Sequence, residues 1–216
     1  MKTHLILSAI AAAALAFVST AATAQVVIVD TLPPVGTNRS NVNTTQANAV
    51  PFTFTDAFDN VTVEASLTAT DNSTLTGTAF LTTAIGPGTT VADVVATAPF
   101  TFASVAAFTE VSYVTLFSGL DLPADDYFLI VAGDGTGGGI TLNPAATYTT
   151  DPDATVSTSQ FAAGTNLDTT FIPASNFGNS GLGNRFIRLT SVPVPEPTSL
   201  GLLGMGGLVM LRRRRA

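Results

Sequence analysis

The sequence has no cysteine and no tryptophan, and its only histidine and only lysine, His4 and Lys2, lie close to its start. A serine–histidine triad, a cysteine nucleophile, a serine–lysine dyad, a Schiff base and a histidine or thiolate zinc site each need one of these residue types. Because the rest of the chain lacks most catalytic constellations, we expect a protein that is not an enzyme.

Basic charge is also scarce. Between Gln25 and Val192 there are 14 Asp and Glu residues and three Arg residues, which gives a net charge of about −11 when all are ionised. Nucleic acid and anionic lipid are poor partners for such a segment. Without disulfides, its stability must come from burial and hydrogen bonding.

The first 24 residues have the three parts of a secretory signal peptide. Lys2 supplies the positive start, Leu5 to Val18 is apolar, and Ala22-Thr23-Ala24 is a small-residue cleavage site. The apolar stretch is short for a membrane span. We therefore predict export by the Sec machinery and cleavage between Ala24 and Gln25.

The C-terminal end has a different three-part pattern. A proline-rich strip at 194–197 precedes an uncharged apolar segment at 198–211 and four arginines, Arg212, Arg213, Arg214 and Arg215. Fourteen helical residues span about 21 Å against roughly 30 Å of hydrocarbon. Arginines stay on the cytoplasmic side, so we predict a short transmembrane helix that anchors the protein transiently in the inner membrane.

Pro195-Glu196-Pro197, the apolar segment with Gly201, Gly204, Gly206 and Gly207, and the arginine cluster together resemble the PEP-CTERM sorting domain of Gram-negative bacteria. The resemblance covers residues 193–216. It implies that an exosortase, a membrane-embedded cysteine protease, cuts near the motif, and that the protein reaches the cell surface or the medium, associated with exopolysaccharide. The alternative is an ordinary single-pass anchor.

Residues 25–192 are enough for one domain, and their composition favours β structure. Apolar and polar residues alternate from Val61 to Ala69, the period of a half-buried strand. The segment 50–54 alternates in the same way, and Asp59-Asn60 would form the turn between them. The denser apolar runs Glu110–Phe117 and Tyr127–Ala132 predict strands in the middle of a sheet.

Turn signals separate these short segments, at Asp71-Asn72-Ser73, Gly86-Pro87-Gly88 and Gly133 to Gly139, and the last strand would be Arg185 to Ser191. This spacing predicts an all-β ectodomain, an antiparallel β-sandwich or jelly roll with two layers. No helix longer than two turns is needed before Leu200. The residues expected to point inward are Val63, Leu67, Val114, Leu116, Leu129, Val131 and Ile187.

The segment 111–133, which contains Leu122-Pro123-Ala124-Asp125-Asp126-Tyr127, resembles the bacterial pre-peptidase C-terminal domains. Those domains are β-sandwiches in which a Leu-x-Ala-Gly-x-Tyr turn precedes a core strand. Asp125 replaces the usual glycine here, and aspartate can adopt a left-handed conformation at such a turn.

Two binding or catalytic alternatives remain open. Paired carboxylates could hydrolyse a glycoside, and the densest acidic group is Asp121, Asp125, Asp126 and Asp134. An exposed platform formed by Tyr113, Tyr127 or Tyr148 would instead indicate a carbohydrate-binding module. Our leading hypothesis is a non-enzymatic structural or adhesive protein of the cell envelope or extracellular matrix.

We expect no cofactor, although calcium is an alternative at the acidic loops, because a hard cation prefers oxygen ligands. The candidate groups are Asp121 with Asp125 and Asp126, and Asp151 with Asp153. We favour solvated loops at both, and assign no metal ligand. The glycine run 133–139 lacks the Lys-Ser/Thr of a phosphate-binding loop, and we interpret it as a flexible hairpin tip.

Overall fold

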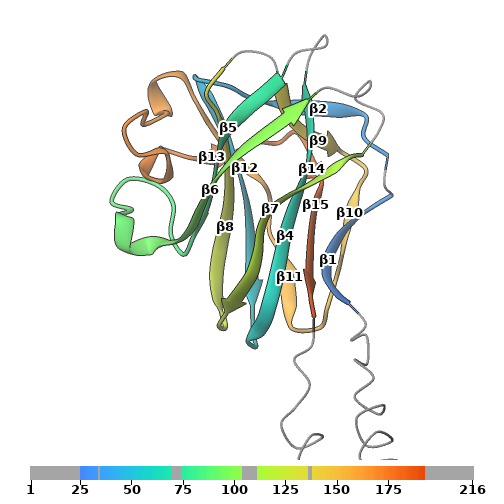
Figure 1. Cartoon of the computed structure of the whole chain (residues 1–216). Coiled ribbons are helices and arrows are strands. Elements are labelled where there is room, and N and C mark those ends of the chain that lie inside the picture. Colours follow the sequence, from blue (N-terminus) through green and yellow to red (C-terminus); the bar gives the residue numbers. More distant parts are fainter. Residues whose placement is uncertain (1–24, 34, 70–73, 104–110, 136–137, 193–216) are drawn as a thin grey trace, which may run out of the picture. The chain divides into compact units, whose positions relative to one another are not determined.

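The computed structural model describes residues 25–192 except 34, 70–73, 104–110 and 136–137 (Figure 1). The predicted signal peptide, the tail from residue 193 and the predicted turn at 71–73 lie outside the described residues. The strands are β1 Val26–Leu32, β2 Asn38–Val42, β3 Gln46–Phe54, β4 Phe58–Ala69, β5 Thr74–Thr82, β6 Val94–Ala103, β7 Tyr113–Leu122, β8 Asp125–Gly133, β9 Gly138–Asn143, β10 Thr147–Thr150, β11 Ala154–Val156, β12 Gln160–Ala163, β13 Gly178–Asn179, β14 Asn184–Arg185 and β15 Ile187–Ser191.

These strands form two antiparallel sheets, as the sequence predicted. The first has the order β10-β1-β15-β4-β9-β14, with β7 paired to β4 and β2 paired to β9. The second has the order β13-β12-β3-β8-β5-β6, with β11 paired to β3. Helical structure in the described residues is limited to three short 3-10 turns, at Val91–Asp93, Gly164–Asn166 and Ile172–Ala174.

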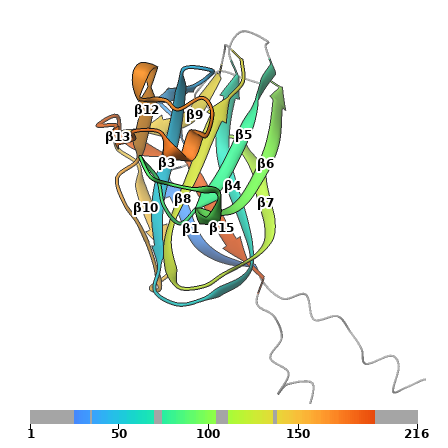
Figure 2. The same ribbon diagram turned by 90° about the vertical axis from the view of Figure 1, so that its left-hand side faces the viewer.

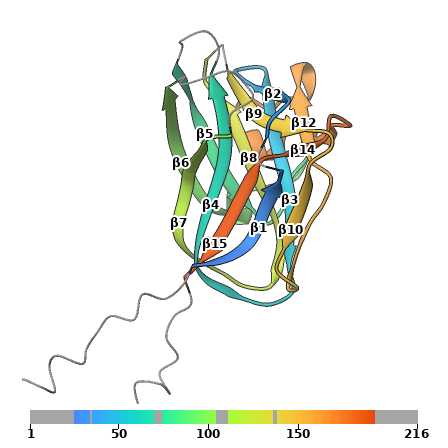
Figure 3. The ribbon, with the colours of Figure 1, turned by 90° about the vertical axis from the view of Figure 1, so that its right-hand side faces the viewer.

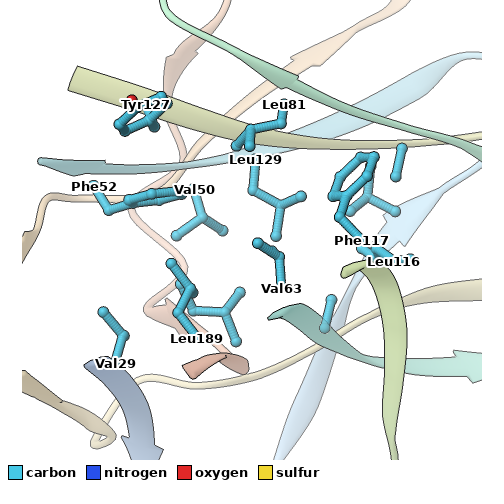
Figure 4. Close-up of a cluster of buried hydrophobic side chains, with 14 of the residues drawn as sticks. Val29, Val50, Phe52, Val63, Leu81, Leu116, Phe117, Tyr127, Leu129 and Leu189 are labelled. Carbon is cyan, nitrogen blue, oxygen red and sulfur yellow. The ribbon is translucent and has the colours of Figure 1, made fainter. Parts of the chain in front are cut away.

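The main core lies between the two sheets (Figure 4). Apolar side chains from β1, β4, β7 and β15 face those from β3, β5 and β8, because alternate residues of each strand point to the same side. Six of the seven residues predicted to point inward are buried, and the seventh, Val114, is half-buried and packs against the same cluster. The inward face was therefore predictable from periodicity alone.

The predicted turn at Asp59-Asn60 is wrong. β4 already begins at Phe58, and the chain reverses at 55–57. Asn60 nevertheless has a left-handed φ of 51°, opposite Gly119 with a φ of 70°, where the β4–β7 register shifts. The Asp-Asn signal therefore marks a β-bulge within a strand, because asparagine tolerates the left-handed region in both settings.

The expectation that the run ending at Phe117 forms a strand in the middle of a sheet is also wrong. Within the described residues β7 pairs only with β4 and so lies at a sheet edge, whereas β8, from the other dense run, lies between β3 and β5. The bulges of β7 bury the adjacent residues Leu116 and Phe117 together. This break in alternation produced the apolar density that resembles a central strand.

The glycine run is not a hairpin tip, because β8 and β9 belong to different sheets. Two of its glycines have a packing role instead. A Cβ on Gly139 would lie 2.4 Å from the carbonyl oxygen of Ser40, and one on Gly138 would lie 2.6 Å from the Leu75 side chain. These positions allow close approach of neighbouring strands and side chains.

A smaller apolar cluster covers part of the outer face of the second sheet, which the two-layer prediction did not include. Two loops, 83–93 and 164–177, lie over this face (Figure 2) and are joined by a hydrogen bond from Gly86 N to Pro173 O of 2.9 Å. The buried members of the smaller apolar cluster are Ala47, Ala49, Ile130, Ala132, Ala162 and Leu167, and the partly buried residues packed against them are Phe80, Ile85, Phe128, Ile172 and Phe177.

Arg185 is fully buried at the junction of the two sheets. Its Nη1 donates to Ser180 Oγ at 2.6 Å and to Gly183 O at 2.8 Å, and its Nη2 donates to Ser40 Oγ at 3.0 Å and to Asn48 Oδ1 at 2.9 Å. Ser40 belongs to β2 in the first sheet and Asn48 to β3 in the second. The guanidinium therefore ties the sheets together through neutral oxygens.

In the described part of the chain no carboxylate pairs with Arg185, and its Nε has no partner. Burial lowers the pKa of Arg185 to about 10, because desolvation disfavours the charged form. The side chain still carries its proton at neutral pH. Its four hydrogen bonds to neutral groups must therefore compensate for the lost hydration.

We predict that Asn48→Ala lowers the free energy of unfolding by about 2–3 kcal/mol, the usual cost of losing a buried hydrogen bond to a charged group. Asn48 also donates to Asn41 O at 2.6 Å, so the same change loosens the β2–β3 corner. Urea denaturation at neutral pH measures the loss. Asn41→Ala, at an exposed position of β2, is the matched control and should change stability by less than about 0.5 kcal/mol. Equal losses in the two variants would contradict this account of Arg185.

Candidate functional site at the chain ends

The predicted site residues lie at the two ends of the described domain. Ala24, Pro195, Glu196, Pro197 and the four arginines Arg212, Arg213, Arg214 and Arg215 lie outside the described residues. Gln25 and Val192 are the described residues nearest to them in the sequence. The structure therefore shows how the first and last described residues of the domain are held.

The first and last strands of the domain are neighbours (Figure 3). Val26 of β1 pairs with Ser191 of β15 in an antiparallel ladder, and the Gln25 side chain donates from Nε2 to Thr190 Oγ1 at 2.6 Å. The described chain thus begins and ends at the same end of the sandwich. β1 was not predicted from the sequence, although the apolar run of Val26 to Val29 after the predicted cleavage site was a signal for a strand.

β15 is an inner strand of its sheet. It pairs with β1 on one side and, from Ile187 opposite Ala65 to Ser191 opposite Val61, with β4 on the other. Ile187 and Leu189 are fully buried, and Ser191, the last residue of the strand, is only 7% exposed. The chain is therefore held on both sides and by its core-facing side chains up to the residue before Val192.

A row of polar side chains crosses the outer face of β15. Arg188 Nε lies 3.3 Å from Asp30 Oδ1 of β1, and the guanidinium carbon lies 4.1 Å from the centre of the Tyr113 ring. In the next strand Glu64, which pairs with Arg188 across the ladder, accepts a hydrogen bond from Thr115 Oγ1 at 3.2 Å. This row links β1, β15, β4 and β7 on the face opposite the core.

Asp30 is central to this row because its Oδ1 accepts from two side chains, in addition to the backbone N–H of Thr31. The Tyr113 hydroxyl donates to the same Asp30 Oδ1 at 3.2 Å. Burial, and next the negative charge of Asp30, raises the pKa of Tyr113 well above its ordinary value. The phenol therefore stays protonated and continues to donate throughout the neutral range.

The turn between β7 and β8 is closed by Tyr127, whose hydroxyl donates to Pro123 O at 2.8 Å. A tyrosine that bonds back to the backbone a few residues upstream is a known device for corners of β-sandwiches. Asp125 is not left-handed, since Asn60 is the only non-glycine residue with a positive φ among those described. The turn is thus made without the conformation that the missing glycine suggested.

The acidic residues considered for catalysis or calcium accept hydrogen bonds from different groups of the protein. Asp121 accepts from Asn60 N at 3.0 Å and Asp126 accepts from Thr53 Oγ1 at 2.5 Å. Asp134 bonds to Thr76 and follows the opposite end of β8 from Asp125, roughly 30 Å away at the usual rise of a strand. Asp151 accepts from Asp153 N at 3.0 Å. Within the described residues no three acidic, histidine or cysteine side chains gather in a way that could hold a metal.

The three tyrosines also form no exposed platform. Tyr127 is 1% exposed, while Tyr113 and Tyr148 are half-buried. Each hydroxyl donates to a protein oxygen, that of Tyr148 to Arg185 O at 3.1 Å. Desolvation is the largest cause of a raised pKa at all three, with the Asp125 charge adding to it at Tyr127.

We predict that none of the three tyrosines titrates near pH 10 in the native protein. Absorbance at 295 nm should rise near pH 10 in denaturant, where the phenols have their ordinary pKa of about 10, and only at higher pH without denaturant. Because the folded-state pKa of each phenol is raised, each phenol stabilises the fold at pH values below its unfolded-state pKa. This contribution to stability is lost as the pH rises through the folded-state pKa. A phenol that ionises near pH 10 in the native protein would contradict the inward placement of these hydroxyls.

The comparisons with known proteins bear on the C-terminal end. The described helices include none that is long and apolar enough to cross a membrane, and the predicted segment 198–211 is not among the described residues. No curated protein matches the chain, and the likeness of residues 111–133 to pre-peptidase domains stays a prediction. The family of the PEP-CTERM protein-sorting motif matches residues 193–215. The chain therefore carries a PEP-CTERM sorting motif that begins two residues after the end of β15, and this motif indicates an exported protein targeted by an exosortase.

Proposed function

We propose that this protein is a non-enzymatic component of the cell envelope or extracellular matrix, structural or adhesive and associated with exopolysaccharide, which an exosortase sorts by the C-terminal tail. The observation that carries the proposal is the sorting motif at 193–215 directly after β15. Because β15 is hydrogen-bonded to a neighbouring strand on each side, attachment of the tail would also attach the whole β-sandwich.

The chemistry of the described domain supports a non-enzymatic role. It contains no histidine, lysine or cysteine, and Asp134, one of the four carboxylates considered for glycoside hydrolysis, follows the end of β8 opposite Asp125 and Asp126. The inward tyrosines also give no support to a carbohydrate-binding module that uses a tyrosine platform. A structural or adhesive role needs a stable, exported domain and a means of attachment, and the proposal requires nothing further.

The division of roles within the tail follows from its residues. Prolines fix their own φ and disfavour helix in the residue before them, so Pro195, Glu196 and Pro197 favour an extended strip that a protease can bind. Moving an arginine to the centre of a bilayer costs on the order of 3 kcal/mol, so Arg212 to Arg215 act as the stop. The tail then passes through the inner membrane only until it is cut.

Mass spectrometry of the protein recovered from cells and from medium tests the proposal as a whole. The expected mature protein begins at Gln25 and lacks the arginine cluster. Surface or medium material that begins at Met1, or that retains Arg212 to Arg215, would contradict it.

We predict that Glu196→Ala leaves membrane insertion intact but impairs processing in a host that has an exosortase, because it changes the recognition strip and leaves the apolar segment as it was. Pulse-chase labelling should show the unprocessed form persisting. Asp59→Ala, at an exposed position of β4, is the matched loss of one carboxylate far from the motif in sequence and should be processed normally. Normal processing of the Glu196→Ala protein would remove the main support for recognition at this strip.

A further inference from the structure

β15 has a position that sorting alone does not require. A tail could follow an edge strand or a loose terminal segment, yet here it follows a strand that is hydrogen-bonded to β1 and β4 over the same residues. We propose that the domain is a load-bearing anchor, in which β15 takes up tension from the tail in shear. This inference rests on the proposed function for the source of the tension, since an attached surface protein is pulled through its tail.

The ladder itself resists such a pull. Tension applied beyond Ser191 acts along β15 in its C-terminal direction, when the domain is held at its far end. Because the inter-strand bonds of an antiparallel ladder lie perpendicular to the strands, the bonds to β1 and to β4 are all strained together. The strand cannot leave until both ladders fail at once.

The side chains of β15 oppose even a small slip. Leu189 faces the core and Arg188 faces outward, paired with Asp30. A shift of one residue would exchange these faces, which would bury the arginine and expose the leucine. The register of β15 is therefore fixed by charge on one face and by apolar burial on the other.

The segment just before β15 acts as a stop. Phe186 and Arg185 are both fully buried, and Arg185 is held by Ser40, Asn48, Ser180 and Gly183. Drawing β15 toward the tail would pull the guanidinium out of these oxygens and into the apolar core. The buried cation thus has a mechanical role, since it holds the end of the strand that lies away from the tail.

The same domain is weak in one other direction. If the N-terminal end and the tail were pulled apart, Val26 and Ser191 would be the first pair to separate, and the β1–β15 ladder would open one pair at a time. Removal of the signal peptide leaves the N-terminal end free, so the mature protein carries no load along this path.

Single-molecule force spectroscopy on the chain from Gln25 to Ala216, with its tail uncut, tests the proposal, and the absence of cysteine lets two introduced cysteines define the pulling direction. One variant carries Thr44→Cys, in the exposed turn between β2 and β3, together with Thr198→Cys in the tail. The other carries a cysteine placed ahead of Gln25 together with Thr198→Cys. Because forced unfolding reports the barrier along the loaded path, we expect about twofold or more rupture force for the first geometry. Equal forces, or a stronger second geometry, would overturn the proposal.

Ser180→Ala, which removes an Arg185 partner outside the β2–β3 corner that carries the pulling cysteine, separates the stop from general stability. Placed in both pulling variants, it should lower the rupture force in the Thr44 geometry and leave the first rupture in the N-terminal geometry unchanged. Equal lowering in both would refute the role of Arg185 as a stop. These measurements do not depend on sorting in cells. A domain that is strong in shear but never processed in cells would refute the proposed function. A processed protein that is weak in shear would refute only the mechanical inference.

Discussion

β15 pairs with β1 through Val26 and Ser191 and with β4 from Ala65 to Val61, so one five-residue strand joins the two ends of the domain to the middle of its first sheet. The core needs this strand for the side chains of Ile187 and Leu189. The outer row needs it for Arg188. The sorting motif needs it as the fixed end from which the tail extends. Each part of the molecule thus depends on the same two ladders.

Arg185 shows that the junction of the sheets is not built for stability alone. A buried charge without a counter-ion has a large desolvation cost, and apolar side chains of similar volume are often as stable or more stable at such positions. The guanidinium instead fixes the relative positions of these elements, because its four hydrogen bonds reach both sheets and the β13–β14 segment in one geometry. An apolar side chain would fill the space without fixing the position of β14 relative to β2 and β3.

The sequence predicted what periodicity can express and missed what depends on contacts distant in the chain. Alternation from Val61 to Ala69 identified β4 and its inward face, and the PEP-CTERM motif was recognisable from the residue types of the tail in order. Asp59-Asn60 was misread because one backbone conformation serves both turns and bulges. Gly138 and Gly139 were misread because glycine favours both flexible tips and close approach, and only the positions of Leu75 and Ser40 distinguish these. The place of β7 at an edge and of β15 inside the sheet could not be inferred, because strand order leaves no local pattern.

The separation of the paired ends has a consequence for how the protein leaves the cell. The bond between Gln25 and Thr190 joins residues 165 positions apart, and closing so long a loop before its contacts form is slow. A polypeptide that is threaded through a narrow channel from its N-terminus cannot complete the first sheet while β15 is still on the near side. On the predicted Sec route, the first sheet could therefore close only when the last strand has emerged. On that route, the order of the strands would delay completion of the fold until the sorting signal itself reaches the membrane.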